Sequence, residues 1–410
     1  MKNANLKIFE LISPKDERDN INLGLSRIKK VLQEMGNPCR NIPAVQIIGT
    51  NGKGSITAFL ESILFEAHKN FGVTTSPHLF DICERIRVNK KNINSIDFEK
   101  IYRSIEKNFA INELTPFEKI ICCALKFFDD RQVELLILEA GLGGRLDATT
   151  AHQLRPIIAI GNIGLDHREF LGDTIEKIAE EKLAVIKKNS IVISCSQNNQ
   201  VENLINKKVE EVGAEIIWKD SISNSCEIGL KGFFQKQNAS VAVGVIEALN
   251  KLGFEVKEKY IYEGLKKTIW HGRLEIINYI DKKILVDCAH NYPAAKALSN
   301  ERSNWNNQVE GIYWIIGVQK QKDMPAILKT LLKKNDHLLL VPVPNQPSWE
   351  LKDLFKVEGI NFQKIIEFEK FEFAIQYLYA LKKWPINHPV LTGSIFLVAE
   401  FIKFANAQKD

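Results

Sequence analysis

The sequence predicts an α/β protein, in which a P-loop-type domain with a doubly wound, mainly parallel sheet precedes a smaller, Rossmann-like α/β domain. Continuous apolar runs such as VELLILEA at 133–140 are typical of parallel strands that are covered on both faces. Helical patterns alternate with these runs, and glycine-rich or polar clusters follow the strands directly. Because doubly wound sheets bind ligands at the carboxyl ends of their strands, we expect the functional side chains at that edge.

The apolar pattern places the elements of the first domain in order. We expect a helix at 22–35, a strand at 44–48, a helix across 56–64, a strand at 71–75, an ordered loop at 80–95, a buried helix at 117–128, strands at 133–140 and 157–163, a helix at 173–188, a strand at 191–194 and a helix at 201–212. Asp173, with Glu176 three residues later, is the expected start of the helix at 173–188.

A second alternation of strands and helices begins near Lys283, after the chain changes character around Trp270. Its expected strands are 284–287, 311–317, 337–343 and 389–393, each followed by a helix. We therefore expect a nucleotide-binding domain at 1–272, a hinge at 273–282 and a smaller α/β domain at 283–410.

Composition narrows the class of protein. The apolar fraction of 45% and the charged fraction of 26% are ordinary for a globular protein, and the net charge of +5 is spread along the chain. Without a basic tail or stripe we expect no nucleic-acid partner, and anionic small molecules as ligands instead. Seven scattered cysteines indicate a reducing compartment. No signal peptide and no apolar run of about 20 residues is visible, so we expect a cytoplasmic protein without membrane contact. We also expect a monomer.

The segment GTNGKGS at 49–55 follows a strand and opens a helix. Its glycines let backbone N–H groups approach phosphates, and the helix adds its positive N-terminal end. Lys53 would reach the terminal phosphates, and Ser55 could face a magnesium ion (Mg2+). The strict Walker pattern is not met, because Ile47 stands where its first glycine belongs and Gly54 separates the lysine from the hydroxyl. A plain glycine-rich surface turn is the alternative.

Two further residues at strand ends are candidate metal ligands. Glu139 ends an apolar strand and precedes Gly143-Gly144, a pair that permits close backbone approach, whereas His167 follows Asp166 after the next strand. A solvent-exposed glutamate and a structural histidine are the alternatives. Together with Ser55 these side chains offer mostly oxygen donors, which suit magnesium near phosphates better than zinc.

Lys182 lies on the apolar face of its expected helix, four residues after Ile178. Such a lysine usually extends along its own stem to water. The alternative is a desolvated amine with a lowered pKa, neutral enough to be chemically modified.

Candidate nucleotide contacts also lie further along the chain. Gln235 and Asn238 begin an apolar helix, where amides could read an adenine edge or cap the helix. Arg273 lies in the expected hinge, a suitable place for a cation that clamps phosphate. Asp287 and His290 follow the first strand of the second domain.

A series of motifs, in this order and spacing, resembles the folylpolyglutamate synthase/dihydrofolate synthase family of the Mur ligase superfamily. The motifs are GTNGKGS at 49–55, TSPHL at 75–79, ERIRVN at 84–89, TPFE at 115–118, EAGLGGRLDATT at 139–150, IGLDH at 163–167, QKQNA at 235–239, HGRLE at 271–275, DCAHN at 287–291, KD at 322–323 and TGSIFLVAE at 392–400. The likeness therefore runs through nearly the whole chain and implies a Mur ligase-like fold.

The resemblance implies a role for each matching residue. ATP would be bound by Thr50, Asn51, Gly52, Lys53, Gly54, Ser55, Asn238, Arg273 and Asp287, with His290 close to the γ-phosphate. Magnesium would be held by Ser55, Ser76, Glu139 and His167, and a second ion by Lys182 in carbamylated form. The pterin would lie near Asn20, Ile21, Asn22, Leu23, Thr115, Phe117 and Leu146, and glutamate between the domains. Lys53, Lys182, Arg273 and His290 are the implied catalytic residues.

The chain departs from the family pattern at three places. Leu183-Ala184 follows Lys182 where the family usually continues E-K with A-G, and Cys288 replaces the glycine of D-G-A-H-N-P. Asn22 occupies a position where bifunctional bacterial members often carry an aspartate beside the pteroate.

The resemblance implies an ATP-dependent ligase that adds L-glutamate to a folate-type carboxylate through an acyl phosphate, and we expect it to be bifunctional. A folylpolyglutamate synthase alone and a Mur-type amino-acid ligase are alternatives, although the latter would normally carry a further N-terminal domain and only residues 1–43 precede the first strand. From another class, a P-loop nucleotide-dependent binding module would explain the first loop. Such a module would need neither the second domain nor Lys182.

Overall fold

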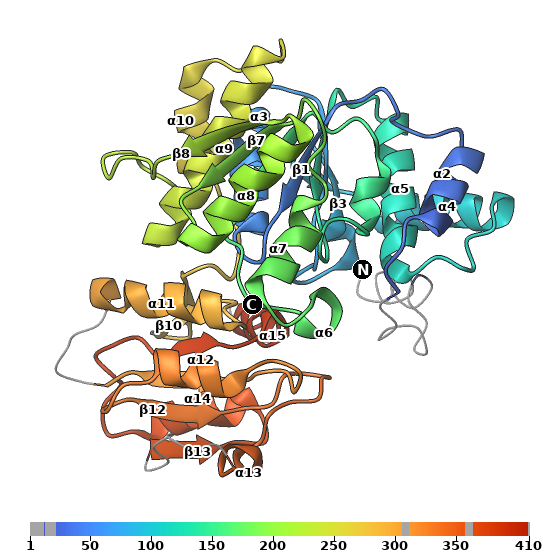
Figure 1. The fold of residues 1–410 in the computed structure, drawn as a ribbon. Coiled ribbons are helices and arrows are strands. Elements are labelled where there is room, and N and C mark those ends of the chain that lie inside the picture. The colour runs from blue at the N-terminus through green and yellow to red at the C-terminus, as the bar shows by residue number, and fades with distance from the viewer. Residues whose placement is uncertain (1–11, 13–21, 306–310, 357–363, 409–410) are drawn as a thin grey trace. The chain divides into compact units, whose positions relative to one another are not determined.

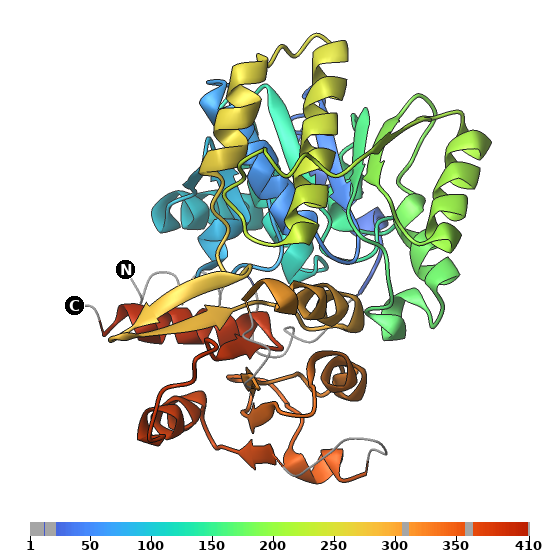
Figure 2. The ribbon, with the colours of Figure 1, turned by 90° about the vertical axis from the view of Figure 1, so that its left-hand side faces the viewer.

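The computed structural model describes residues 12, 22–305, 311–356 and 364–408. The chain divides into two compact units, which Figures 1 and 2 show in two views. Unit 1 comprises Met1–Gly229 and Gln235–Ile269, and unit 2 comprises Leu230–Phe234 and Trp270–Asp410. Both units are α/β with mainly parallel sheets, which confirms the predicted fold class.

Unit 1 is built on an eight-stranded sheet in the order β4-β3-β2-β5-β1-β6-β7-β8. Its strands are β1 Ala44–Ile48, β2 Phe71–Thr74, β3 Ile86–Val88, β4 Lys91–Asn92, β5 Leu135–Glu139, β6 Ile157–Ile160, β7 Ile191–Cys195 and β8 Glu215–Lys219. From β2 to β8 the pairing is parallel, while β3 and β4 are antiparallel. Ile47 lies beside Glu139, and Ile48 lies beside Ile160. The central strands therefore end at one edge of the sheet.

Helices cover both faces of this sheet, so its central strands are buried and apolar (Figures 1 and 2). The helices and 3₁₀ turns are α2 Ser26–Glu34, α3 Lys53–Glu66, η2 Ile82–Arg85, α4 Ser95–Asn108, α5 Pro116–Asp130, η3 Ala148–Ala151, α6 Arg168–Leu171, α7 Ile175–Leu183, α8 Asn199–Val212, α9 Phe233–Lys251 and α10 Glu258–Lys267. Helices α2, α4 and α5 share a buried apolar cluster with Leu136 and Leu138 of β5. Helices α7 and α8 share another with Ile158 and Ile160 of β6.

The prediction of a loop at 80–95 is wrong. This segment forms η2 and the hairpin β3–β4, which extends the sheet beyond β2 through backbone hydrogen bonds. The strands are too short for an alternating pattern to show in the sequence. Strand β8 was not predicted either, because it is the outermost strand on the side of the sheet opposite to β4 and is only partly buried.

The predicted bounds of the helix at 173–188 are also wrong. Helix α7 begins at Ile175, capped by the Thr174 hydroxyl, which accepts a hydrogen bond from the Lys177 N–H. Asp173 is exposed and pairs with Arg168 at 3.3 Å instead. The helix ends at Leu183, so Lys182 lies in its last turn.

Unit 2 contains a six-stranded sheet in the order β13-β12-β11-β14-β10-β9, parallel except for β9. Its elements are β9 Glu275–Tyr279, β10 Lys282–Val286, α11 Tyr292–Trp305, β11 Tyr313–Ile316, α12 Met324–Leu331, β12 His337–Leu340, α13 Leu351–Leu354, β13 Ile365–Glu367, α14 Phe371–Ala380, β14 Val390–Thr392 and α15 Ile395–Asn406. The expected linker at 273–282 therefore contains strand β9, in which buried Ile277 and Tyr279 alternate with exposed residues. Strand β13 was not predicted. No helix in the described part of the chain is long and apolar enough to cross a membrane.

Candidate active site

The phosphate loop, residues 49–55, joins β1 to α3. Gly52 precedes the helix with a φ of 87°, which favours glycine, and a Cβ there would lie 2.5 Å from the Asn238 side chain. The backbone N–H groups of Gly54 and Ser55 fall in the first turn of α3, where the helix offers them no carbonyl partner. The first turn of α3 therefore presents donors suited to an anion.

The beginning of the loop is braced against the segment after β6. The N–H groups of Thr50 and Asn51 donate to the Asn162 carbonyl at 2.7 and 3.1 Å. The Thr50 hydroxyl donates to the Gly164 carbonyl at 2.9 Å. Lys53 folds back over the loop, and its Nζ donates to the carbonyls of Gly49 and Thr50 at 3.0 and 3.2 Å. In this arrangement Thr50 and Asn51 shape the loop, and their N–H groups point to the Asn162 carbonyl.

Lys182 meets the same loop from helix α7. The lysine is buried, with 5% of its surface exposed, and its Nζ donates to the Gly49 carbonyl at 3.1 Å. Burial and, after it, the positive charge of Lys53 lower the pKa of Lys182 to about 7. The sequence allowed either a lysine that extends to water or a desolvated lysine, and the structure shows the desolvated one.

The loop after β5 positions α7. Buried Asp147 accepts hydrogen bonds from the N–H groups of Gly141 and Leu142 at 2.8 and 2.9 Å, which fixes the turn. A Cβ at Gly144 would lie 2.7 Å from the Lys182 carbonyl oxygen. The close approach expected of this glycine is therefore made to the backbone of α7, and Asp147 is a supporting residue that sequence reasoning missed.

The four candidate metal ligands of the sheet follow adjacent strands at one edge. Ser76 follows β2, Glu139 ends β5, Ser55 follows β1 and His167 follows β6. Glu139 and Ser55 are buried, with 4% and 2% of their surfaces exposed, whereas the His167 side chain is 38% exposed. The His167 Nε2 lies 3.7 Å from the Asp166 carboxylate. The topology thus brings the predicted residues to a common edge.

The segment that carries Ser76 is held by a buried ion pair. The Arg87 guanidinium contacts the Glu61 carboxylate at 2.9 Å and donates to the Thr75 hydroxyl at 2.9 Å. Because Glu61 lies on α3, this pair ties the hairpin to the helix that begins at the phosphate loop.

The turn between Ser76 and β3 is ordered by Glu84, which accepts hydrogen bonds from the N–H groups of residues 79–81 at 2.8–2.9 Å. The next residue, Arg85, donates from Nε to the His78 Nδ1 at 2.9 Å. Arg85 was not singled out from the sequence, where its only signal is its place in the segment 84–89.

Asn238 connects helix α9 with the phosphate loop. Its Oδ1 would lie 2.5 Å from a Cβ on Gly52, and its Nδ2 donates to the Gln235 Oε1 at 3.0 Å. Gln235 is fully buried. The two amides expected at the start of this helix therefore contact one another beside the loop.

Residues expected around a pterin lie near the start of α5. Thr115 caps this helix in a capping box with Glu118, whose carboxylate also contacts Arg27 at 3.4 Å. Arg27 in turn donates to the Asn22 carbonyl at 2.6 Å. These contacts bring Asn22 and Thr115 into one neighbourhood.

The same neighbourhood includes the loop after β5. The Phe117 ring lies 3.0 Å from the place of a Cβ on Gly141, so the ring packs over this glycine. Phe117, Leu146 and Leu23 are half-buried. Residues 20–21, the other two candidates, lie outside the described residues.

In unit 2 two of the predicted residues, Asp287 and His290, follow β10, and the third, Arg273, precedes β9. The Asp287 carboxylate accepts hydrogen bonds from the N–H groups of Leu274 and Ala289 at 3.0 and 2.9 Å. Burial raises its pKa, and the charge of Arg273 opposes that shift. Asp287 therefore joins the segment of Arg273 to the end of β10.

His290 is oriented by the backbone. Its Nδ1 lies 2.8 Å from the Cys288 carbonyl, which can only accept a hydrogen bond, so Nδ1 carries the hydrogen. In the neutral ring Nε2 is then an acceptor. The Cys288 thiol fills the space beside Gly272, where a Cβ would lie 2.6 Å from the sulfur.

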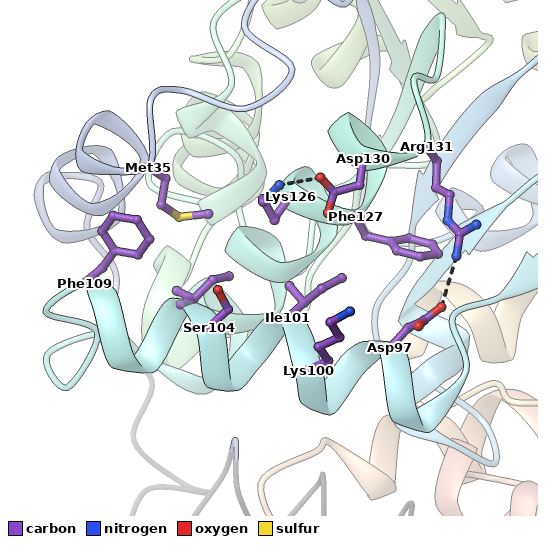
Figure 3. Close-up of a pocket in the computed structure, with 11 residues that line it drawn as sticks. Met35, Asp97, Lys100, Ile101, Ser104, Phe109, Lys126, Phe127, Asp130 and Arg131 are labelled. Atoms are coloured by element: carbon purple, nitrogen blue, oxygen red, sulfur yellow. Dashed lines mark hydrogen bonds and ion pairs between the residues drawn. The ribbon is translucent and has the colours of Figure 1, made fainter.

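A pocket of about 310 Å³ lies apart from these residues, between α4 and α5 (Figure 3). Its lining is Met35, Asp97, Lys100, Ile101, Ser104, Ile105, Phe109, Lys126, Phe127, Asp130 and Arg131. Figure 3 shows Arg131 directed at Asp97, and their ion pair measures 3.0 Å. None of the predicted site residues lines this pocket.

Comparison with known proteins covers both units. Residues 47–207 match the model of the Mur ligase middle domain, and residues 273–404 match that of the dihydrofolate synthetase C-terminal domain. The dihydrofolate synthetase of Saccharomyces cerevisiae is 30% identical, over 94% of this chain and 99% of that protein. The dihydrofolate synthase/folylpolyglutamate synthase of Haemophilus influenzae is also 30% identical, over 93% of each.

Solved structures of similar fold cover almost the whole chain. E. coli FolC in complex with DHPP and ADP has a TM-score of 0.85 and 26% identity, over 99% of this chain and 98% of that one. A bifunctional folylpolyglutamate synthase/dihydrofolate synthase with Mn, AMPPNP and L-glutamate bound has a TM-score of 0.82 and 25% identity, over 95% of this chain and 96% of that one.

Proposed function

The chain belongs to the dihydrofolate synthase/folylpolyglutamate synthase family, and we propose that it joins L-glutamate to the carboxylates of both dihydropteroate and reduced folates. The general activity of the family is the ATP-dependent ligation of glutamate in folate metabolism. Relatives of equal identity carry one activity or both in their names. The names of the relatives therefore do not decide which acceptors this chain uses, and we assign both to it.

The observation that carries the proposal is the contact of Lys182 with the phosphate loop. A lysine whose pKa is lowered to about 7 by burial has a large neutral fraction near neutral pH, and a neutral amine can react with carbon dioxide to form a carbamate. Such a carbamate would place negative oxygens beside Gly49, where the unmodified Nζ now donates. A nucleotide-binding module without ligase chemistry has no need of this arrangement.

The proposed reaction has two steps. An oxygen of the acceptor carboxylate attacks the γ-phosphorus of ATP, the bond from that phosphorus to the bridging oxygen breaks, and ADP leaves. The neutral glutamate amine then attacks the acyl carbon of the acyl phosphate. The tetrahedral intermediate loses a proton from this nitrogen to solvent and expels phosphate to leave an amide. Both steps are assisted mainly by positioning and by neutralisation of negative charge.

We assign the nucleotide to two groups of residues. Lys53, with the amides of the phosphate loop, neutralises the phosphates, and Asn238 beside Gly52 contacts the nucleotide. In unit 2, Arg273 and Asp287 contact ATP and His290 acts near the γ-phosphate, where its Nε2 can accept a hydrogen bond.

The donor set fits magnesium. Two hydroxyls, one carboxylate and one imidazole follow adjacent strands, and within the described residues no three His, Cys, Asp or Glu side chains form a metal cluster of their own. Magnesium at nucleotide sites typically takes one or two carboxylates and completes its shell with phosphate oxygens and water. We therefore propose that Ser55, Ser76, Glu139 and His167 hold it, and that carbamylated Lys182 holds a second ion. When bound, the metal neutralises charge on the transferring phosphoryl group.

The pterin is assigned to the neighbourhood of Phe117, whose half-buried ring packs over Gly141. An aromatic face suits a flat heterocycle. Asn22, Leu23, Thr115 and Leu146 are its proposed neighbours, together with Asn20 and Ile21.

A second candidate is dihydrofolate synthase activity alone. It is favoured by the match of residues 273–404 to the dihydrofolate synthetase C-terminal domain. In this case dihydropteroate would be the sole acceptor.

The acyl phosphate can be tested by isotope transfer. With an acceptor whose reacting carboxylate carries ¹⁸O, one labelled oxygen should appear in the released inorganic phosphate for each amide formed. Phosphate without label would exclude the acyl-phosphate route.

A further inference from the structure

The 84–89 segment contains two arginines in contrasting surroundings. Arg87 is 5% exposed, and its guanidinium donates to Glu61, Thr75 and the Glu84 carbonyl. Arg85 is half-buried, and among the described residues its guanidinium makes one hydrogen bond, from Nε to the His78 ring. A structural role accounts for Arg87 and leaves Arg85 unexplained.

The strand register places Arg85 at the catalytic edge. Thr74 of β2 pairs with Ile86 of β3 on one side and with Leu138 of β5 on the other. One residue further toward the carboxyl end of β2, the Thr75 N–H donates to the Arg85 carbonyl at 3.2 Å, and Leu138 is followed by Glu139. Arg85 therefore stands level with Glu139 and directly before Ser76 across three adjacent strands.

The local contacts leave Arg85 positively charged, with N–H donors available for a ligand. The neighbouring Glu84 carboxylate is engaged by three backbone N–H groups and forms no ion pair with Arg85 among the described residues. Burial lowers the pKa of Arg85 to about 10, opposed by the charges of Glu84 and Glu139, so it stays protonated at neutral pH. Among the described residues its Nη1 and Nη2 have no protein acceptor.

The position also separates Arg85 from Lys53 and Lys182, the two lysines that contact the phosphate loop. Lys53 and Lys182 both contact Gly49, at the end of β1. Arg85 directly precedes β3, three strands from β1 in the sheet and beyond both β5 and β2. The loop that follows β5 packs under the Phe117 ring. Under the function proposed above, Lys53 and Lys182 therefore lie with the ATP phosphates at β1, whereas Arg85 lies on the side of β2 and β5, toward the acceptor site assigned around Phe117.

We propose that Arg85 is a further catalytic residue, whose guanidinium binds the reacting carboxylate of the acceptor with its two Nη groups. This proposal rests on the function proposed above. A guanidinium matches the two oxygens of a carboxylate and fixes its direction. One oxygen attacks the γ-phosphorus, the other stays on Arg85, and the arginine keeps its proton throughout. After phosphoryl transfer the same contact neutralises charge on the acyl phosphate.

The test compares Arg85→Gln and Arg85→Lys with the same changes at Arg103, an exposed arginine on α4. For Arg85→Gln we expect kcat/KM for the acceptor to fall by about 100- to 1000-fold, the cost typical of one lost charge-stabilising group. Arg85→Lys should recover only part of this loss, because lysine lacks the planar fork. The dissociation constant of a non-hydrolysable ATP analogue should stay within twofold of the parent, and the Arg103 variants should match the parent in every respect.

Chemical rescue keeps the test decisive if the substitution disturbs the fold. Guanidinium ion, added below denaturing concentrations, should raise the activity of Arg85→Ala and not that of Lys53→Ala. Acceptor kinetics unchanged in Arg85→Gln, a loss confined to nucleotide affinity, or no rescue would each overturn the assignment to the acceptor carboxylate. Ligation by the parent protein tests the proposed function separately, since it can persist while the Arg85 proposal fails.

Discussion

The Nζ of Lys182 donates a hydrogen bond to the Gly49 carbonyl at 3.1 Å, so a buried amine touches the first residue of the phosphate loop. Desolvation by burial is the largest cause of its lowered pKa, and the nearby Lys53 adds to it. The protein thus keeps an amine, whose burial is unfavourable, beside the phosphate loop. The contact links the fold to the proposed chemistry, and it can be tested by stability as well as by activity.

Lys182 should make stability depend on pH. Its pKa is about 7 when folded and 10.5 when exposed, so between these values the unfolded chain binds more protons and the free energy of unfolding rises with pH. The penalty is complete below about pH 7 and absent above about 10.5. Lys182→Met should therefore be more stable at pH 7, by up to about 5 kcal/mol, with the gain shrinking toward pH 10. Urea unfolding in carbonate-free buffer measures this.

The matched control is Lys177→Met, an exposed lysine on the same helix. It should leave both the stability and its pH dependence as in the parent. Parallel pH profiles for Lys182→Met and the parent would contradict the lowered pKa.

Removing the same amine should abolish ligation. For Lys182→Ala we expect a loss of about 100- to 1000-fold in rate, the magnitude typical of a lost charge-stabilising group. Added bicarbonate should not restore activity, because no amine remains to form a carbamate. A steady-state assay of amide formation checks this, and a rate equal to that of the parent would remove Lys182 from the mechanism.

Gly52→Ala should impair nucleotide binding. The new Cβ would lie 2.5 Å from the Asn238 Oδ1, so the side chain proposed to contact ATP must move. Gly253→Ala is the control, because Gly253 has a φ of 86°, close to the 87° of Gly52, and no atom within 4 Å of the added Cβ. Both changes carry the backbone strain of a positive φ, about 1 kcal/mol. We expect the affinity for an ATP analogue, measured by calorimetry, to fall at least tenfold in Gly52→Ala alone, and equal affinities would contradict the contact.

Arg87→Met should destabilise unit 1. It leaves the Glu61 carboxylate buried without its guanidinium, which typically costs about 3–5 kcal/mol. The double variant Arg87→Met/Glu61→Met should recover most of the loss, because no unpaired charge remains. Chemical unfolding of the three proteins measures the difference, and a double variant no better than the single one would show that the ion pair is not the cause.

The central part of the fold could be predicted from the sequence because parallel strands such as β1 and β5 are buried on both faces and read as continuous apolar runs. The same logic placed Glu139 and His167 at one edge, since residues that follow parallel strands must meet there. The edge strands β3, β4 and β8 escaped prediction, because they are short or half-exposed and are held by backbone pairing.

The contacts that complete the site could not be predicted, because they join residues distant in sequence. Nothing in the local pattern shows that Asn238 reaches Gly52, or that the backbone of α7 packs closely against Gly144. The position of Lys182 on an apolar face allowed two outcomes, and only the depth of burial decides between them. Arg85 and Arg87 look alike in the sequence and differ only in the partners that the fold supplies.

The most direct test of the account is transfer of labelled L-glutamate by the purified protein with ATP and magnesium, with dihydropteroate and tetrahydrofolate offered separately. We predict an amide product with each acceptor, and one ADP and one phosphate released per amide. Product with dihydropteroate alone would narrow the function to dihydrofolate synthesis. Product with neither acceptor, or ATP turnover that does not depend on glutamate, would contradict the account.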